Sequence, residues 1–157
     1  MRREPLPAVL LLALGCGHAA APRPEPPRDD EAVLEAVYRW QIADLASRGA
    51  PMGEYFLSDA RGGDPSEAFV QRFSDLSPRP RRKSESEAAP DAGIRDRATG
   101  ARGGILSVRG IEWRADGTVE VRVQVYAGPE GAEGATLILA PQGPAWTVRE
   151  ARDRWIS

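Results

Sequence analysis

The sequence predicts an α+β domain in which helices come first and an antiparallel sheet follows. Apolar residues recur at helical spacing between residues 33 and 45, whereas from Gly104 onward the hydrophobic period is two. Helices followed by a run of strands are the order typical of α+β proteins. We therefore expect one long and one short helix, packed on a curved antiparallel sheet of four to five strands.

The long helix is expected to begin after Asp29. Acidic residues at 29–31 supply a capping oxygen and negative charge, which a helix N-terminus favours. Gly49 and Pro51 mark its end. Its apolar face consists of Leu34, Tyr38, Ile42 and Leu45, widened by Val33, Val37 and Trp40. So broad a face indicates a helix that lies across a sheet.

A short strand over residues 54–58 and a second helix are expected next. Asp64 is predicted to cap this helix, with Pro65 in its first turn and Glu67 reaching back to the cap. Its apolar face is formed by Phe69, Phe73 and Leu76, and Pro78 ends it.

Residues 78–102 are predicted to be a loop, with a short edge strand over 83–87 as the alternative. The segment opens with the basic residues Arg79, Arg81, Arg82 and Lys83, and acidic residues follow at once. A solvated loop is the favoured interpretation of this charge run, over a site for anionic headgroups. Residues 96–100 read as a turn into the next strand. Arg102-Gly103-Gly104 is followed by a strand, so it lacks the order of a phosphate-binding loop.

The remaining chain predicts an antiparallel meander. A strand over residues 105–114 leads to Asp116-Gly117, which is a tight-hairpin signal. Val119, Val121, Val123 and Val125 then alternate with polar residues, so one face of this strand should be buried. Strands over 135–140 and 145–156, separated by Gly/Pro turns, complete the sheet.

The first sixteen residues have the order of a secretory leader: basic, then apolar, then small. The apolar stretch over residues 6–14 is far shorter than the ~20 residues of a spanning helix. Leu12-Ala13-Leu14-Gly15-Cys16 resembles the bacterial lipoprotein box. That resemblance implies cleavage after Gly15 and lipidation, such as palmitate, on Cys16, the one cysteine of the chain. The alternatives are an ordinary cysteine in a conventional signal peptide or in a buried strand.

These signals divide the chain into a signal peptide (1–15), a lipidated cysteine with a proline-rich tether (16–28) and one α+β domain (29–157). Four prolines between residues 22 and 27 favour an extended tether. Without the leader the chain holds 19 basic and 22 acidic residues, a formal charge of −3, because the leader removes two basic groups and one acidic group. Such a surface predicts no nucleic-acid partner. The expected partners are a membrane, through Cys16, and a protein or small-molecule ligand. Gly17 favours the outer membrane, facing the periplasm.

Few residues of the domain suggest catalysis. His18 is the one histidine and lies in the tether, so the domain can contain neither a histidine base nor a Cys/His metal site. Acidic residues gather around the second helix, where capping and turns are the favoured explanation over hydrolysis or Ca²⁺ binding: Asp59, Asp64, Glu67 and Asp75. Trp113, Trp146 and Trp155 are expected in the core or at its rim rather than as a ligand platform. We predict no cofactor and no catalytic residue.

A helix over a curved antiparallel sheet resembles the cystatin-like and NTF2-like folds, and the domain is similar to small uncharacterised secreted bacterial proteins. This resemblance rests on four segments: 55–58, 64–66 leading to Phe69 and Phe73, 96–100, and 155–157. It implies a fold and no activity. The function we expect is therefore a non-catalytic binding or interaction module of an envelope lipoprotein. The alternatives are a small enzyme that uses carboxylates alone in a helix–sheet cleft, or a structural assembly component.

Overall fold

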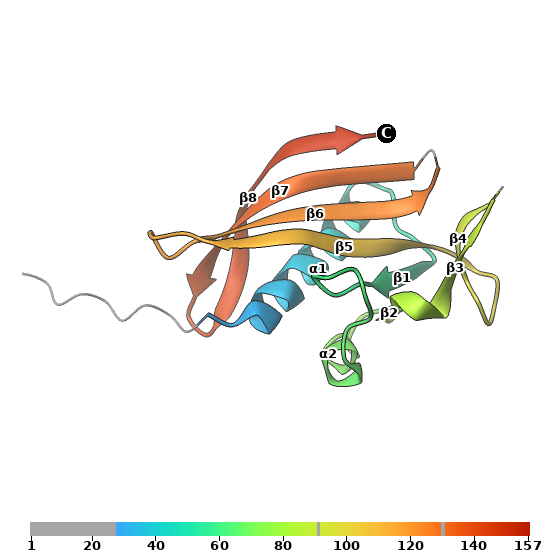
Figure 1. The fold of residues 1–157 in the computed structure, drawn as a ribbon, viewed down its shortest axis with the longest axis horizontal. Coiled ribbons are helices and arrows are strands. Elements are labelled where there is room, and N and C mark those ends of the chain that lie inside the picture. Colours follow the sequence, from blue (N-terminus) through green and yellow to red (C-terminus); the bar gives the residue numbers. More distant parts are fainter. Residues whose placement is uncertain (1–27, 91, 130) are drawn as a thin grey trace, which may run out of the picture.

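The computed structural model describes residues 28–90, 92–129 and 131–157 (Figure 1). The leader, Cys16 and nearly all of the expected tether therefore lie outside the described residues. These described residues form two α-helices and one eight-stranded sheet. The elements are α1 (Asp30–Ser47), β1 (Glu54–Leu57), α2 (Glu67–Gln71), β2 (Arg81–Arg82), the 3₁₀ helix η1 (Lys83–Glu85), β3 (Ser86–Ala89), β4 (Gly93–Asp96), β5 (Arg102–Trp113), β6 (Val119–Gly128), β7 (Gly131–Gln142) and β8 (Ala145–Ile156).

The α+β class is confirmed, but the expected antiparallel sheet of four to five strands is wrong in strand number and in direction. The main path of the sheet runs β2-β1-β5-β6-β7-β8, and β4 joins β3 to β5. Strand β1 pairs in parallel with both β2 and β5, so the sheet is mixed. A parallel neighbour requires a crossover connection, which here runs through α2, η1 and β2–β4.

Three of the extra strands lie in residues 78–102, which the sequence predicts to be a loop. Strands β2, β3 and β4 have two to four residues each, too few for a visible hydrophobic period. Ile94 of β4 is buried and pairs with Gly103 of β5. Strand β2 pairs with β1 and β4 pairs with β5, while β3 pairs with its sequence neighbour β4. Strands this short depend on their partners more than on intrinsic propensity.

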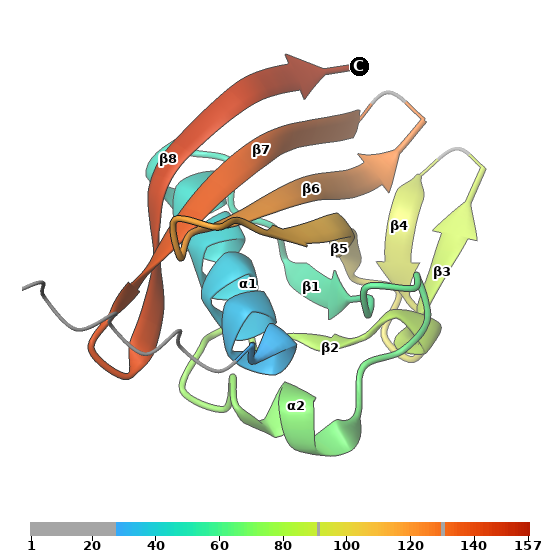
Figure 2. The same ribbon diagram turned by 60° about the vertical axis from the view of Figure 1, so that its left-hand side comes forward.

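Helix α1 begins at its predicted cap. The Asp29 carboxylate accepts a hydrogen bond from the Ala32 N–H at 3.0 Å. Val33, Val37 and Leu45 are buried on the side that faces the sheet, and strands β7 and β8 bend around one side of the helix (Figure 2). None of the described helices is long and apolar enough to cross a membrane.

The cap predicted for α2 is wrong by two residues. Ser66, not Asp64, accepts the Phe69 N–H, at 3.1 Å, and the helix ends at Gln71, well before Pro78. The Asp64 carboxylate instead accepts the Ser84 N–H at 2.8 Å, which fastens the loop before α2 to η1. Phe69 packs edge-on against Tyr38 of α1, with ring centroids 6.2 Å apart.

The meander agrees with the sequence. Asp116-Gly117 lies at the β5–β6 hairpin, where Gly117 takes a φ of +81° that favours glycine. The four alternating valines of β6 are buried, and Leu137 and Leu139 of β7 continue the same core. Strand β8 has the predicted bounds. The sheet therefore presents one apolar face to α1, which positions the site described next.

Candidate functional site

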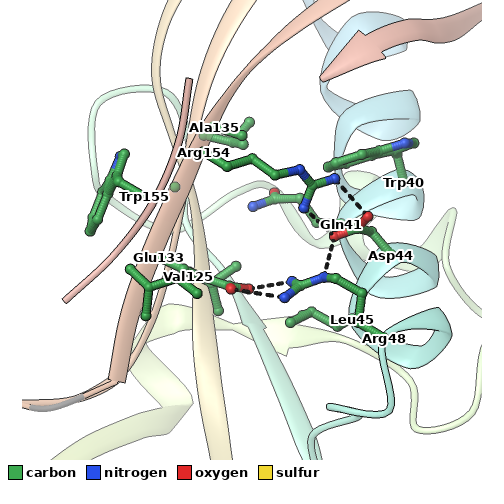
Figure 3. A pocket seen from close by; sticks show the side chains of 13 residues that line it. Trp40, Gln41, Asp44, Leu45, Arg48, Val125, Glu133, Ala135, Arg154 and Trp155 are labelled. Carbon is green, nitrogen blue, oxygen red and sulfur yellow. Dashed lines mark hydrogen bonds and ion pairs between the residues drawn. The ribbon is translucent and has the colours of Figure 1, made fainter. Parts of the chain in front are cut away.

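A cavity of about 270 Å³ lies between α1 and strands β6–β8 (Figure 3). Its apolar walls come from helix α1 and from the consecutive strands β6 and β7, far along the chain from the helix. They consist of Trp40, Leu45, Val123, Val125 and Ala135. In β6 the side chains at 123 and 125 share a face, and register places them opposite Ala135 and Glu133 of β7. The alternation of apolar residues along β6 therefore places their side chains on the strand side of the cleft, and helix α1 forms the other side.

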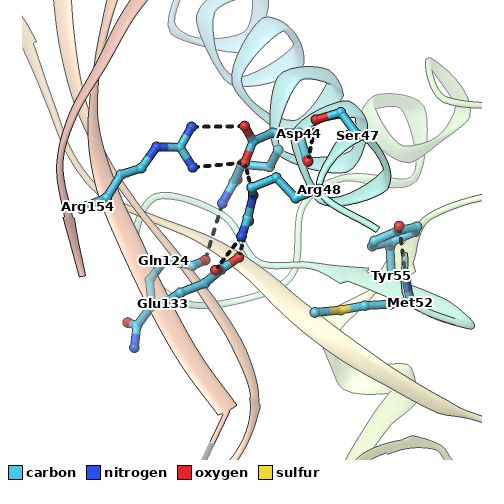
Figure 4. Close-up of polar contacts among 9 residues, drawn as sticks. Asp44, Ser47, Arg48, Met52, Tyr55, Gln124, Glu133 and Arg154 are labelled. Carbon is cyan, nitrogen blue, oxygen red and sulfur yellow. Dashed lines mark hydrogen bonds and ion pairs between the residues drawn. The ribbon is translucent and has the colours of Figure 1, made fainter. Parts of the chain in front are cut away.

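Four charged side chains join α1 to the sheet at this cleft, and we call them the charged quartet: Asp44, Arg48, Glu133 and Arg154 (Figure 4). Arg154 donates to both Asp44 carboxylate oxygens, at 2.9 and 3.1 Å. Arg48 donates from Nε to Asp44 at 2.9 Å and from its two Nη atoms to Glu133 at 2.7 and 3.1 Å. Paired N–H···O bonds of this kind fix orientation as well as contributing energy.

A β-bulge brings Arg154 to the cleft. Gly134 pairs with Trp155 and Thr136 with Arg152, so two residues of β8 stand opposite Ala135 alone. Asp153, the first of the two, has a φ of +51°. In a regular strand residues 152 and 154 would share a face; the bulge separates them. Arg152 accordingly bonds Glu120 while Arg154 reaches Asp44 on α1.

The ion pairs of the charged quartet shift the pKa values of three of its members, Asp44, Arg48 and Arg154. The hydrogen bond from Arg154, followed by that from Arg48, lowers the pKa of Asp44 below its usual value. The bond to Glu133 raises the pKa of Arg48, and the bond to Asp44 raises that of Arg154. Two positive and two negative groups cancel. Arg154 also forms a cation–π contact with Trp40, with its Cζ atom 5.4 Å from the centroid of the ring.

Gln41 is the polar residue inside the cleft. It is 2% exposed and projects from α1 toward the strands (Figure 3). Its Nε2 donates to the Gln124 carbonyl at 3.4 Å, a long bond, and its Oε1 has no hydrogen-bond partner. A buried acceptor without a partner costs about 1–3 kcal/mol.

The acidic residues noted in the sequence mostly serve turns and ion pairs. Asp59 accepts the N–H groups of Arg61 and Gly63, and Asp75 pairs with Arg39 at 2.9 Å. Asp59 and Asp64 do line one smaller cavity, of about 140 Å³, whereas Glu67 and Asp75 do not line it. In that cavity Asp59 and Asp64 are held by backbone N–H groups, and the third carboxylate that lines it, Glu31, pairs with Arg72.

Of the three tryptophans in residues 105–157, two pack against the core as expected. Trp113 and Trp146 form an edge-to-face pair with centroids 5.3 Å apart, and Trp113 Nε1 donates to Asp30 at 3.0 Å. Trp155 is 45% exposed. It lies across Gly134, on the far side of the strands from Arg154, so its backbone rather than its ring borders the cleft (Figure 3).

The basic run is structured rather than a free loop. Arg81 pairs with Glu85 at 3.0 Å and with Asp96, and Lys83 donates to the Gly62 carbonyl at 2.7 Å. The turn predicted over residues 96–100 is confirmed, because Asp96 accepts the N–H groups of Ala98 and Thr99.

Sequence reasoning missed the charged quartet and Gln41. Gln41 had a visible signal, since it lies four residues from both Val37 and Leu45 on the buried face of α1. Asp44 and Arg48 also stand four apart, as a helical ion pair does. No pattern in the neighbouring sequence predicts that these two residues bond Glu133 and Arg154.

Within residues 28–90, 92–129 and 131–157, no three His, Cys, Asp or Glu side chains are grouped so that they could hold a metal ion. Comparison of the chain with family models, with characterised proteins and with solved structures found no match.

Proposed function

We propose that this chain is a bacterial cell-envelope lipoprotein whose α+β domain binds a small ligand, without reacting with it, in the cleft between α1 and β6–β8. The anchor is lipid attached to Cys16, and the location is the outer membrane, facing the periplasm. The basic, apolar and small residues that precede Cys16 support this part of the proposal. Two or more acyl chains make such attachment stable, whereas one holds only marginally.

The observation that carries the binding role is the make-up of the cleft. Its walls are mostly apolar, the four charged side chains that also line it are paired with one another, and a buried amide oxygen of Gln41 is without a partner. An apolar cavity with few convergent polar groups is the usual form of a small-molecule site.

The same cleft argues against the alternative of an enzyme that uses carboxylates alone. Its two carboxylates, Asp44 and Glu133, are each held by arginine. A general acid needs a pKa near the working pH, and the pKa of Asp44 is lowered. Ion-paired carboxylates of this kind hold the cleft together and are poorly placed to exchange protons.

A cleft-filling variant tests the binding role. Ala135→Leu adds bulk to the cleft wall, while Gln142→Leu adds the same side chain to an exposed position of the same strand. The probe is N-phenyl-1-naphthylamine, a dye that fluoresces in apolar surroundings. We expect wild type and Gln142→Leu to bind the dye and Ala135→Leu to bind it at least tenfold more weakly. Equal binding by all three folded proteins would place the dye elsewhere and refute the cleft site.

Fatty-acid labelling tests the anchor. In growing bacteria, wild type and the neighbouring variant His18→Ala should incorporate labelled palmitate and sediment with membranes. Cys16→Ala should do neither. Unchanged labelling and sedimentation of Cys16→Ala would remove the lipoprotein proposal.

A further inference from the structure

Gln41 is an unusual residue to find at its position. The core-facing side of α1 is otherwise built from Val33, Val37, Tyr38 and Leu45, and a leucine or methionine at 41 would fit the helix as well. Instead the chain buries an amide whose Oε1 is without a partner and whose Nε2 makes one bond of 3.4 Å. Gln41 is among the residues that line the cleft, so its buried amide belongs to the wall that a bound molecule would contact.

The charged quartet has few donors left for a ligand. All three side-chain nitrogens of Arg48 already donate, to Asp44 and Glu133. Both Nη atoms of Arg154 donate to Asp44, and its guanidinium lies over the Trp40 ring. An anionic ligand would compete with Asp44 and Glu133 for the arginines, and a cationic one would compete with the arginines for the carboxylates.

We infer that the ligand of this cleft is a small, uncharged, mostly apolar molecule with one O–H or N–H donor, which binds Gln41 Oε1. This inference rests on the proposed function and names its substrate class. A volume of about 270 Å³ lies just below the range of ~300–1,000 Å³ that drug-sized ligands occupy, so the molecule is a small one. The apolar body contacts Val123, Val125 and Ala135, and the donor supplies the hydrogen bond that Gln41 lacks.

Four six-carbon compounds distinguish between the possible polar groups of the ligand. Hexan-1-ol has an O–H donor, 1-methoxypentane has an oxygen without a donor, hexanoate is an anion and hexylammonium is a cation. The full chain carrying Cys16→Ala, which can take no lipid at that position, is titrated with each while its ¹H–¹⁵N NMR spectrum is recorded. Shifts of the Gln41 side-chain amide and of the Val123 and Ala135 backbone amides report on the cleft.

We expect hexan-1-ol to bind roughly three- to tenfold more tightly than 1-methoxypentane, because one net hydrogen bond separates the two. Hexanoate and hexylammonium should bind more weakly than either. Gln41→Met keeps the length of the side chain and removes the acceptor. In that variant the two neutral probes should bind equally, with 1-methoxypentane unchanged from wild type.

The contrary results separate the two proposals. Neutral probes that shift the cleft amides with no preference for the alcohol, or a tightest complex with hexanoate or hexylammonium, would overturn the ligand class and leave the cleft as a binding site. A preference for the alcohol that survives in Gln41→Met would also overturn it. If no probe shifts the cleft amides in a folded chain, the proposed function fails together with the inference.

Discussion

Replacing Asp44 by asparagine removes the centre of the charged quartet without changing its shape. The Asp44 carboxylate accepts three guanidinium hydrogen bonds, of 2.9 to 3.1 Å, and its side chain is 16% exposed. Hydrogen bonds to charged groups contribute about 1.5–3 kcal/mol each when buried, and exposed ion pairs about 0–1. The side chains of Arg48 and Arg154 are 35% and 44% exposed, so each ion pair should contribute less than a buried bond and more than a fully exposed pair. We expect Asp44→Asn to lower the free energy of unfolding by about 1–3 kcal/mol.

The assay is urea denaturation followed by circular dichroism at pH 7. Glu87→Gln is the control, because Glu87 is an exposed acid on β3, and its effect should stay within about 0.5 kcal/mol. A free energy of unfolding for Asp44→Asn within 0.3 kcal/mol of wild type, on the order of experimental error, would refute the view that the quartet fastens α1 to the sheet.

The pH dependence gives the same prediction a second check. Hydrogen bonds from Arg154 and Arg48 lower the folded-state pKa of Asp44 below its unfolded value of about 3.9. A lowered pKa contributes stability that is fully present above the unfolded pKa and is lost as the pH falls through the folded pKa. The difference between wild type and Asp44→Asn should therefore be constant from about pH 7 to 5 and shrink below about pH 4. A difference that grows on acidification contradicts the assignment.

Four further substitutions, in three tests, probe the fold and the buried amide. Val121→Asp should unfold the domain, because Val121 is fully buried and an unpaired buried carboxylate costs several kcal/mol, whereas Gln124→Asp on the opposite face should remain folded by circular dichroism; equal behaviour would show that the faces of β6 are misassigned. Gln41→Met should raise the free energy of unfolding by about 1 kcal/mol in urea denaturation, because it removes an unpaired buried oxygen; a loss above 1 kcal/mol would mean that this amide is satisfied. Gly93→Ala should lower the free energy of unfolding by on the order of 1–3 kcal/mol, and therefore the melting temperature by several degrees. The reason is that Gly93 has a φ of +73° and that a Cβ there would meet the Ala127 carbonyl oxygen. An unchanged melting temperature would contradict the close approach of β4 to β6.

The parts of the fold that the sequence predicts are those with a local cause. Asp29 caps α1 because its carboxylate lies three residues before the N–H that it accepts, and the valines of β6 are buried because they recur with a period of two. Strands β2–β4 have no such period, because each consists of two to four residues. Strand β2 pairs with β1 and β4 with β5, so these two depend on segments elsewhere in the chain, whereas β3 pairs with its sequence neighbour β4.

The same distinction between local and long-range causes applies to the candidate site. Gln41 could have been found, since a polar residue interrupts an apolar helical face there. The bond from Arg154 to Asp44 joins residues 110 positions apart and depends on the bulge at Asp153. A bulge is one extra residue in a strand, and no period in residues 145–156 reveals it. The charges of β8 therefore read as a solvated edge, although one of them holds the cleft.

Native mass spectrometry of the chain isolated from bacterial membranes shows directly whether the anchored domain carries a ligand in its cleft. Wild type should carry a covalent lipid mass on a chain that begins at Cys16, together with a second, non-covalent mass that is released on unfolding and is absent from Ala135→Leu. A native mass equal to that of the polypeptide with its anchor alone, identical in both proteins, would contradict the claim that the cleft between α1 and β6–β8 holds a ligand.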